Sequence, residues 1–355
     1  MSDTAMSLRS MEGVDFSNQT VLVRVDFNIE QTNISNVEEH FRLDIVKETV
    51  DTIAVAPGAR IALLTHFGRP EGKKVDKYSV VKIQESVSRA LGRDIVFVSD
   101  CIGASVERAL EQSAPDQVLL LENVRFYEGE EKNDESFARE LAKPFTLFIN
   151  EAFSVCHRAH ASVEAITRIL PSYAGLRLLK EVDELSRVSL SPEHPAIAIV
   201  GGAKIETKLP LIHALEERYD AILVGGKVAN EAIDQKISFS EKVLLPKDFD
   251  SSDRLDIGPQ TVGYYTQIIN MAKTIIWNGP MGKFEEKPYD IGTDAILHAL
   301  LSSKAYVVIG GGESLAVLER AGVIGRVSFV SSGGGAMLEY LSGQTLPGLA
   351  ALEPI

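Results

Sequence analysis

The sequence has few cysteines and no long uninterrupted apolar stretch. Its two cysteines, Cys101 and Cys156, are too few for a fold held together by disulfides and are typical of a reducing compartment. No apolar run approaches the ~20 residues that a transmembrane helix needs. The N-terminal segment, with Asp3, Arg9 and Glu12, lacks the apolar core of a secretion signal. We therefore expect a cytoplasmic protein without a membrane span.

Positive charge is also scarce. The chain has 36 basic and 50 acidic residues, which gives a net charge of −14. Because such a surface repels phosphate backbones, nucleic acids and anionic membranes are not expected partners. Arg nevertheless outnumbers Lys 12 to 7 in residues 1–171. Arg is the side chain best suited to bidentate binding of carboxylate and phosphate, so we expect a local anion site in the first half.

The length of 355 residues, with 45% hydrophobic and 24% charged residues, is typical of a globular chain with two domains. Apolar β-branched runs predict strands at 20–27, 59–67, 95–98, 117–123 and 145–153, and again at 196–202, 221–226, 274–280, 306–312 and 327–335. Amphipathic stretches between the strands of the first half predict helices near 43–56, 79–91, 104–113 and 134–142. This alternation indicates an α/β fold with two doubly wound parallel sheets. Helical spacing of the apolar residues through 173–190 predicts one long helix between the halves.

Arginine follows the strands of the first half. The strand ends read Arg24-Val25-Asp26-Phe27-Asn28, His66-Phe67-Gly68-Arg69-Pro70, Glu122-Asn123-Val124-Arg125-Phe126 and, after the fifth strand, His157-Arg158-Ala159-His160, and Arg42 is expected at the start of the first helix. One such arginine is usually a surface residue. Several of them at the carboxyl ends of parallel strands share one edge of the sheet, which is where ligands bind in such folds. We expect them to hold a small anion such as a phosphorylated carboxylic acid.

Glycine follows the strands of the second half. The strand ends read Gly201-Gly202-Ala203-Lys204, Gly225-Gly226-Lys227, Asn278-Gly279-Pro280-Met281-Gly282, Gly310-Gly311-Gly312-Glu313-Ser314 and Gly333-Gly334-Gly335. Any one of these could be a tight turn. Together they predict a nucleotide site, because glycine lets backbone N–H groups approach a ligand and a helix N-terminus attracts phosphate. Lys204 and Lys208 lie one helical turn apart, so both can face a phosphate chain.

Familiar nucleotide motifs are absent. Leu315 and Leu338 stand where a G-x-G-x-x-G pattern needs glycine, and Val228 stands where a Walker A loop needs Ser or Thr. Ordinary dinucleotide-binding and P-loop folds are therefore disfavoured. The neighbours Cys156 and His157 favour packing over a nucleophilic pair, since adjacent residues on an extended segment point apart. His157 and His160 have no evident third metal ligand.

The motifs jointly resemble the phosphoglycerate kinase family. Arg-Val-Asp-Phe-Asn (24–28), His-Phe-Gly-Arg-Pro (66–70), Glu-Asn-Val-Arg-Phe (122–126), Gly-Gly-Ala-Lys (201–204) and Trp-Asn-Gly-Pro-Met-Gly (277–282) occur in the family's order, and the resemblance spans nearly the whole chain. It implies reversible transfer of the acyl phosphate of 1,3-bisphosphoglycerate to Mg-ADP, which gives 3-phosphoglycerate and ATP, in a monomer that closes about a hinge. It also implies four parts: a substrate domain (1–172), the connecting helix (173–190), a nucleotide domain (191–341) and a tail that returns to the first domain (342–355).

The resemblance implies roles for individual residues. Phosphoglycerate would be bound by Asp26, Phe27, Asn28, Arg42, His66, Phe67, Gly68, Arg69, Arg125 and Arg158. The nucleotide would be bound by Gly202, Ala203, Lys204, Lys208, Gly225, Gly226, Asn278, Pro280, Glu285, Gly311, Gly312, Glu313 and Ser314. The catalytic groups would be Arg42, Lys204, Gly311 and Gly334, and Mg²⁺ would be held by Glu313 with the nucleotide phosphates.

The chain also departs from the family's usual pattern. Glu313-Ser314 replaces Asp-Thr, Glu151 replaces Asp, Ser154-Val155-Cys156 replaces a Gly-Thr pattern, and Lys227 replaces a third glycine. The stretch from Glu231 to Gly263 is shorter than usual. Two hypotheses follow from the sequence. The chain is an active kinase, or it is a non-catalytic paralogue that binds a nucleotide or metabolite. The retained Arg42, Lys204, Lys208 and Glu285 favour the kinase.

Overall fold

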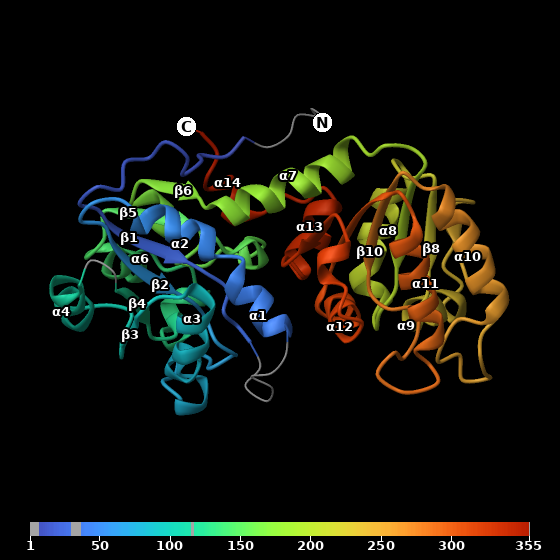
Figure 1. Ribbon diagram of the computed structural model, residues 1–355, viewed down its shortest axis with the longest axis horizontal. Coiled ribbons are helices and arrows are strands. Elements are labelled where there is room, and N and C mark those ends of the chain that lie inside the picture. Colours follow the sequence, from blue (N-terminus) through green and yellow to red (C-terminus); the bar gives the residue numbers. More distant parts are fainter. Residues whose placement is uncertain (1–6, 30–36, 115–116, 355) are drawn as a thin grey trace. The chain divides into compact units, whose positions relative to one another are not determined.

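The computed structural model describes residues 7–29, 37–114 and 117–354 (Figure 1). Asp3 of the N-terminal segment lies outside the described residues. The chain divides into two compact units. The N-terminal unit comprises the described residues of Met6–Glu181 together with those of Thr345–Ile355, and the C-terminal unit comprises Val182–Gln344.

The N-terminal unit is built on a six-stranded parallel sheet of order β3-β4-β2-β1-β5-β6. Its strands are β1 (Thr20–Arg24), β2 (Arg60–Leu64), β3 (Ile95–Val98), β4 (Val118–Leu121), β5 (Leu147–Asn150) and β6 (Ser172–Ala174). Its main helices are α1 (Val37–Asp44), α2 (Lys47–Ala54), α3 (Gln84–Leu91), α4 (Ala104–Gln112), α5 (Glu128–Glu131), α6 (Glu135–Ala142) and α14 (Pro347–Ala350).

Both faces of this sheet are covered. Val21 and Val23 of β1 belong to a core cluster with residues of α2 and α3, whereas Leu22 belongs to a second cluster with residues of α4 and α6. Successive side chains of a strand point to opposite faces, so each face needs its own helical layer. This explains why the strands are apolar throughout and confirms the predicted α/β fold with helices on both faces.

The C-terminal unit repeats the architecture with a second six-stranded parallel sheet of order β12-β11-β10-β7-β8-β9. Its strands are β7 (Ala196–Val200), β8 (Ala221–Val224), β9 (Val243–Leu244), β10 (Thr274–Asn278), β11 (Tyr306–Gly310) and β12 (Phe329–Ser331). Its helices are α8 (Ile205–Glu216), α9 (Gly226–Asp234), α10 (Pro259–Met271), α11 (Ile291–Ser302), α12 (Gly312–Arg320) and α13 (Gly335–Leu341). Every residue of β7 and of β10 is buried.

The helix α7 (Leu176–Leu190) runs across the division of the chain at Glu181. It begins three residues later than the sequence predicted, because Tyr173 and Ala174 belong to the edge strand β6. The C-terminal segment lies within the N-terminal unit: Arg9 donates its backbone N–H to Leu352 O (2.8 Å), and Gly348 donates to Cys156 O (2.9 Å).

Two further differences separate prediction from structure. The helix predicted at 43–56 is in fact the pair α1 and α2, so Arg42 lies in the last turn of α1 and not at the start of a helix. The strands β6 and β9 were missed because three and two residues are too short for a recognisable alternation.

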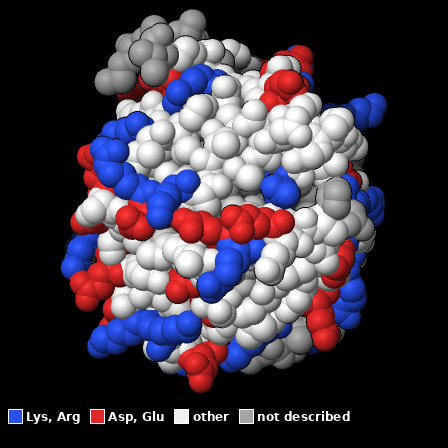
Figure 2. Space-filling model, turned by 90° about the vertical axis from the view of Figure 1, so that its left-hand side faces the viewer, with Lys and Arg blue, Asp and Glu red and all other residues white. Residues whose placement is uncertain are grey.

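Within the described residues, no helix is long and apolar enough to cross a membrane. On the face of the molecule drawn in Figure 2, basic and acidic side chains are interleaved. The net negative charge is therefore not gathered into a single-sign patch on that face.

Candidate functional site

In the N-terminal unit, the polar side chains at the carboxyl ends of β1 and β2 meet around Asp26. Arg42 Nη1 lies 2.8 Å from Asp26 Oδ2, and Ser154 Oγ donates to the same oxygen at 2.5 Å. His66 Nδ1 lies 3.8 Å from Oδ1. Burial alone would raise the pKa of Asp26, but Arg42 and the hydrogen bond from Ser154 lower it overall. The carboxylate therefore stays charged and orients Arg42.

Arg24 is fully buried behind this cluster. Its Nε donates to Ser162 Oγ (2.9 Å), and its Nη2 lies 3.2 Å from His66 Nδ1. Since a guanidinium only donates, His66 Nδ1 accepts and the imidazole is neutral. Burial and the positive charge of Arg24 agree with this, because they hold the pKa of His66 well below its ordinary value although Asp26 opposes them. Arg24 thus fixes the tautomer of His66.

Arg125 has donors that the protein does not use. Its Nη1 donates to Gly68 O (2.8 Å), while Nε and Nη2 are buried without a hydrogen-bond acceptor. Glu131 Oε1 is 3.4 Å from Nε and forms an ion pair with it. Burial lowers the pKa of Arg125 to about 10, so the group is still cationic at neutral pH. A buried cation with free N–H groups is the mark of an anion site.

The other predicted residues of this unit take different places. Phe27 and Phe67 are buried, and Asn28 Oδ1 accepts from the Gly68 N–H at 2.8 Å. Arg158 Nε donates to His157 Nε2 (3.1 Å), whose Nδ1 is buried without a partner. Arg69 is exposed and, within the described part of the chain, makes no hydrogen bond or ion pair. The structure therefore brings several of the predicted residues together around Asp26, and the exposed Arg69 side chain has no partner among the described residues.

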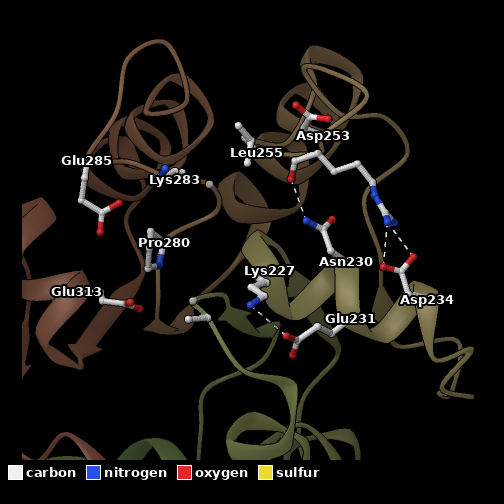
Figure 3. Close-up of a pocket in the computed structure, with 14 residues that line it drawn as sticks. Lys227, Asn230, Glu231, Asp234, Asp253, Leu255, Pro280, Lys283, Glu285 and Glu313 are labelled. Carbon is white, nitrogen blue, oxygen red and sulfur yellow. Dashed lines mark hydrogen bonds and ion pairs between the residues drawn. The ribbon is translucent and has the colours of Figure 1, made fainter.

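The C-terminal unit contains a cavity of about 760 Å³ (Figure 3), a volume typical of a small-molecule site. It is bordered by Gly202, Ala203, Lys227, Asn230, Glu231, Asp234, Asp253, Arg254, Leu255, Pro280, Gly282, Lys283, Glu285 and Glu313. Five of the predicted nucleotide residues line it, namely Gly202, Ala203, Pro280, Glu285 and Glu313. Sequence reasoning missed Asn230, Asp234, Asp253, Arg254, Leu255 and Lys283, because none of them directly follows a strand that the sequence predicts.

Several predicted nucleotide residues instead build the frame of the cavity. Asn278 Oδ1 accepts from Lys208 Nζ, and Asn278 Nδ2 donates to Gly310 O (2.7 Å). Ser314 Oγ is buried and accepts from the Gly279 N–H at 2.7 Å. Its hydroxyl therefore holds the turn after β10. Gly311 and Gly334 precede α12 and α13 with φ of +100° and +50°.

Glu313, which borders the cavity, interacts with Gly202 and Lys208. Glu313 lies in the first turn of α12, and a Cβ added to Gly202 would come 2.9 Å from Glu313 Oε2. The φ of Gly202 is +94°, a backbone conformation that other residues rarely adopt, so both this φ and the nearby Glu313 side chain favour glycine at this position. Burial lowers the pKa of Lys208 to about 8, although Glu313 favours its charged form.

The carboxylate of Glu313, in the first turn of α12, fits a nucleotide-bound Mg²⁺. Mg²⁺ is commonly held by one or two carboxylates together with substrate phosphates and water. Over the described ranges, no group of three or more His, Cys, Asp or Glu residues is arranged to hold a metal by itself. A metal that arrives with a nucleotide needs no such group, so the residues present are compatible with Mg²⁺.

Two other predictions concern Cys156 and Glu151. Cys156 is buried, and burial raises the pKa of its thiol to about 12, which disfavours a nucleophile, as the sequence indicated. The Glu151 carboxylate bonds to α2 and α7 instead of to the cluster around Asp26. It accepts from Thr49 Oγ1 (2.5 Å) and from two backbone N–H groups of α7. The unusual acidic residue at 151 thus serves the connecting helix.

Comparison with known proteins agrees with this geometry. The family model for phosphoglycerate kinase matches residues 11–239 and 231–344. The phosphoglycerate kinases of Geobacter metallireducens and Rhodospirillum centenum are 37% and 38% identical, over 98% of this chain and 99% and 100% of theirs. Among solved structures, the phosphoglycerate kinase of Coxiella burnetii is similar with a TM-score of 0.81 at 30% identity, covering 98% of this chain and 99% of that one. That of Pyrococcus horikoshii OT3 has a TM-score of 0.86 at 28% identity, covering 97% and 98%.

Proposed function

The chain belongs to the phosphoglycerate kinase family, and from this membership we propose that it transfers the acyl phosphate of 1,3-bisphosphoglycerate to ADP, reversibly, giving 3-phosphoglycerate and ATP. The observation that carries the proposal is the buried Arg125 guanidinium, whose Nε and Nη2 have no hydrogen-bond acceptor, in the same unit as the pair of Asp26 and Arg42. This arrangement supports the binding of a small, highly charged anion.

The anion site of the N-terminal unit would bind 3-phosphoglycerate. Arg125 and Arg158 bind its phosphate, and Asp26 holds Arg42 in place through the 2.8 Å ion pair. His66 is neutral and donates its remaining ring N–H, at Nε2, to the substrate. Arg69 is exposed on the loop after β2 and adds long-range attraction for the anion.

The cavity of the C-terminal unit would bind ADP or ATP. Gly202, Ala203 and Glu313 border the phosphate end, since they lie at the N-termini of α8 and α12, where backbone N–H groups favour anions. Glu285 and Pro280 border the nucleoside. Mg²⁺ held by Glu313 and the phosphates would supply charge neutralisation on the oxygens of the transferred group.

For this reaction the protein mainly has to align the two substrates and to neutralise the negative charge of the transferring phosphoryl group. The bond from phosphorus to the carboxyl oxygen breaks while a bond forms from phosphorus to a terminal oxygen of ADP, and the leaving group is the carboxylate of 3-phosphoglycerate. No proton moves, so no general base is required. Arg42 and Lys204 would contact the oxygens of the transferring phosphoryl group and stabilise its charge.

Because the two substrates bind to different units, the units must approach one another during turnover. Hinge motion about α7 would bring the substrates together and exclude water, which would otherwise hydrolyse the acyl phosphate. Solution scattering tests this step: the radius of gyration should fall when 3-phosphoglycerate and Mg-ATP are both saturating, and an unchanged radius would overturn it.

We also propose that the protein works as a cytoplasmic monomer and binds neither nucleic acid nor membranes. The net charge of −14 supports the second part, because anionic polymers and surfaces are repelled. Sedimentation at micromolar concentration checks the first part.

A coupled assay with 3-phosphoglycerate, Mg-ATP and the purified chain tests the proposed reaction directly. Turnover with ATP supports the kinase. Binding of both substrates without turnover would favour the second candidate, a non-catalytic binder. The unusual Glu151, Lys227 and Glu313 are the reason to consider this candidate. The same assay with GTP examines the base preference of a cavity that carries Lys227 and Arg254.

A further inference from the structure

Glu231 of α9 makes a hydrogen bond to a different helix. Its Oε2 accepts from the backbone N–H of Ile205, the first residue of α8, at 2.8 Å. The N-cap residue of α8 is Lys204, which makes no side-chain capping bond of its own. The first N–H groups of a helix have no partner within that helix. Glu231 therefore supplies from α9 the cap that α8 lacks.

This bond limits what the N-terminus of α8 can offer to a phosphate. The helix that follows Gly201-Gly202 was expected to offer its first backbone N–H groups to the phosphates of a nucleotide. The N–H of Ile205 is instead taken by the protein's own carboxylate. One of the first four N–H groups of α8 is thus occupied by the protein, and the Lys204 side chain and the N-terminus of α12 are further groups that can meet the phosphates.

The same bond fixes the segment that carries Lys204. The Gly202 N–H donates to Pro280 O (3.0 Å), and Gly202 O accepts from the Val228 N–H (3.2 Å). These bonds hold the start of the segment, and the bond from Ile205 to Glu231 holds its end. Lys204 itself is extended, with φ −140° and ψ 118°, and exposed. The backbone on both sides of Lys204 is thus anchored while its side chain is free to meet a ligand.

The Glu231 carboxylate also borders the cavity, where it would repel the phosphates of a nucleotide. Lys227, one turn earlier on α9, places its Nζ 3.6 Å from Glu231 Oε1 (Figure 3). The Lys227 side chain is 66% exposed and that of Glu231 24%. The lysine is therefore positioned to offset the negative charge at the mouth of the site while the carboxylate keeps its structural bond.

We propose that Glu231 is a positioning residue of the nucleotide site, which caps α8 and thereby holds Lys204 at the phosphate end, and that Lys227 neutralises Glu231 so that the phosphates can enter. This inference rests on the proposed kinase function for the role of Lys204. The cap and its neutralisation are statements about binding and backbone order, so they are tested without turnover as well.

The first experiment compares Glu231→Ala, Glu231→Gln and Glu217→Ala in the full-length chain. Glu217 is an exposed carboxylate at the other end of α8 and serves as the matched control for lost charge. Amide exchange of Ile205 should accelerate by about fivefold in Glu231→Ala, the usual size of a lost capping bond, and stay near wild type in Glu231→Gln, whose amide oxygen still accepts. Unchanged exchange in Glu231→Ala would overturn the cap.

The kinetic readout separates positioning from binding. Glu231→Ala should lower kcat by about tenfold, because a displaced Lys204 no longer meets the transferring group, while Glu231→Gln and Glu217→Ala stay within about threefold of wild type. A Glu231→Gln variant as slow as Glu231→Ala would contradict the capping role, since it keeps the hydrogen bond. If the wild-type chain has no kinase activity, the proposed function is wrong. The amide exchange of Ile205 still tests whether Glu231 caps α8, because that measurement does not depend on turnover.

The second experiment tests Lys227 with Mg-ADP as the calorimetric probe. Lys227→Met should raise the Kd for Mg-ADP roughly threefold at low salt, as expected for a partly exposed charge pair. The difference between variant and wild type should shrink in about 0.5 M salt, because salt screens the repulsion between Glu231 and the phosphates. The double variant with Glu231→Gln should return the Kd to near the wild-type value, because the unpaired carboxylate is gone. A double variant as weak as Lys227→Met would show that Lys227 acts by another route and would overturn the neutralisation.

Discussion

Glu151 Oε1 accepts a hydrogen bond from the backbone N–H of Arg177 at 3.0 Å, so a buried carboxyl group at the end of β5 caps the first turn of α7. Thr49 Oγ1 donates to the same oxygen, and the Leu178 N–H donates to Oε2 at 3.2 Å. Burial raises the pKa of Glu151 to about 7 even though these donors favour the charged form. The start of the connecting helix therefore depends on a group that titrates near neutral pH.

Glu151→Gln should change the pH dependence of stability. The carboxyl binds its proton more tightly in the folded chain, with a pKa of about 7, than at its ordinary value of 4.5. Its stabilising contribution is thus complete below about pH 4.5 and is lost as pH rises through 7. From pH 5 to pH 8, the wild type should lose roughly 1–3 kcal/mol more unfolding free energy in urea than the variant. The exposed Glu135→Gln should follow the wild type, and equal losses in wild type and Glu151→Gln would refute the assignment.

Arg42→Ala should lower kcat by about 10²-fold or more, in the range found when one donor to the transition state is removed. Arg42 pairs with Asp26 at 2.8 Å but lies in the last turn of α1, outside the sheet, so we expect its truncation to leave the sheet intact. Steady-state kinetics with 3-phosphoglycerate and Mg-ATP measure the effect. Arg139→Ala, in a surface pair with Glu135, is the control. A kcat within threefold of wild type would remove Arg42 from the mechanism.

Replacement by Met should mainly affect substrate binding at Arg125 and mainly affect stability at Arg24. Arg125 keeps buried donors unused, so Arg125→Met should raise the KM for 3-phosphoglycerate at least about tenfold and leave stability within about 1 kcal/mol of wild type. Arg24 has its donors engaged with Ser162, Val25 and His66, so Arg24→Met should cost about 2 kcal/mol or more. Steady-state kinetics and urea unfolding of both variants test these expectations. A larger loss of stability for Arg125→Met, together with a larger rise in KM for Arg24→Met, would contradict the assigned roles.

Glu313→Gln should weaken the binding of the Mg-nucleotide complex. The variant keeps the size of the side chain and removes the charge that Mg²⁺ requires, so the KM for Mg-ADP should rise by about tenfold. Glu313→Asp should lie much closer to wild type. Excess EDTA should abolish turnover of the wild type, and added Mg²⁺ should restore it. Equal KM values for the Gln variant and the wild type would exclude Glu313 as the metal-binding carboxylate.

Most of the fold could be predicted from the sequence, because strands that are buried on both faces appear as short continuous apolar runs. The ten predicted strands overlap β1 to β5, β7, β8 and β10 to β12, and all of them except the one at 95–98 extend into the turn that follows the strand. Residues such as Asp26 and Gly202 were found for that reason: they directly follow a buried strand. The short β6 and β9 have no such signal, and the break between α1 and α2 at Ile45 and Val46 is not marked by proline or glycine.

The sequence by itself determined the α/β class, the two sheets and the residue types at their edges, because burial and periodicity are local properties of the chain. Only the tertiary structure decided which partners those residues have. The capping of Ile205 by Glu231 and of Arg177 by Glu151 joins residues 26 positions apart in each case. Such bonds leave no periodic trace in the sequence, since they depend on how separate helices and strands pack. The same reason explains why Ser314 holds a turn and why Asn230 and Arg254 line a cavity that the sequence did not assign to them.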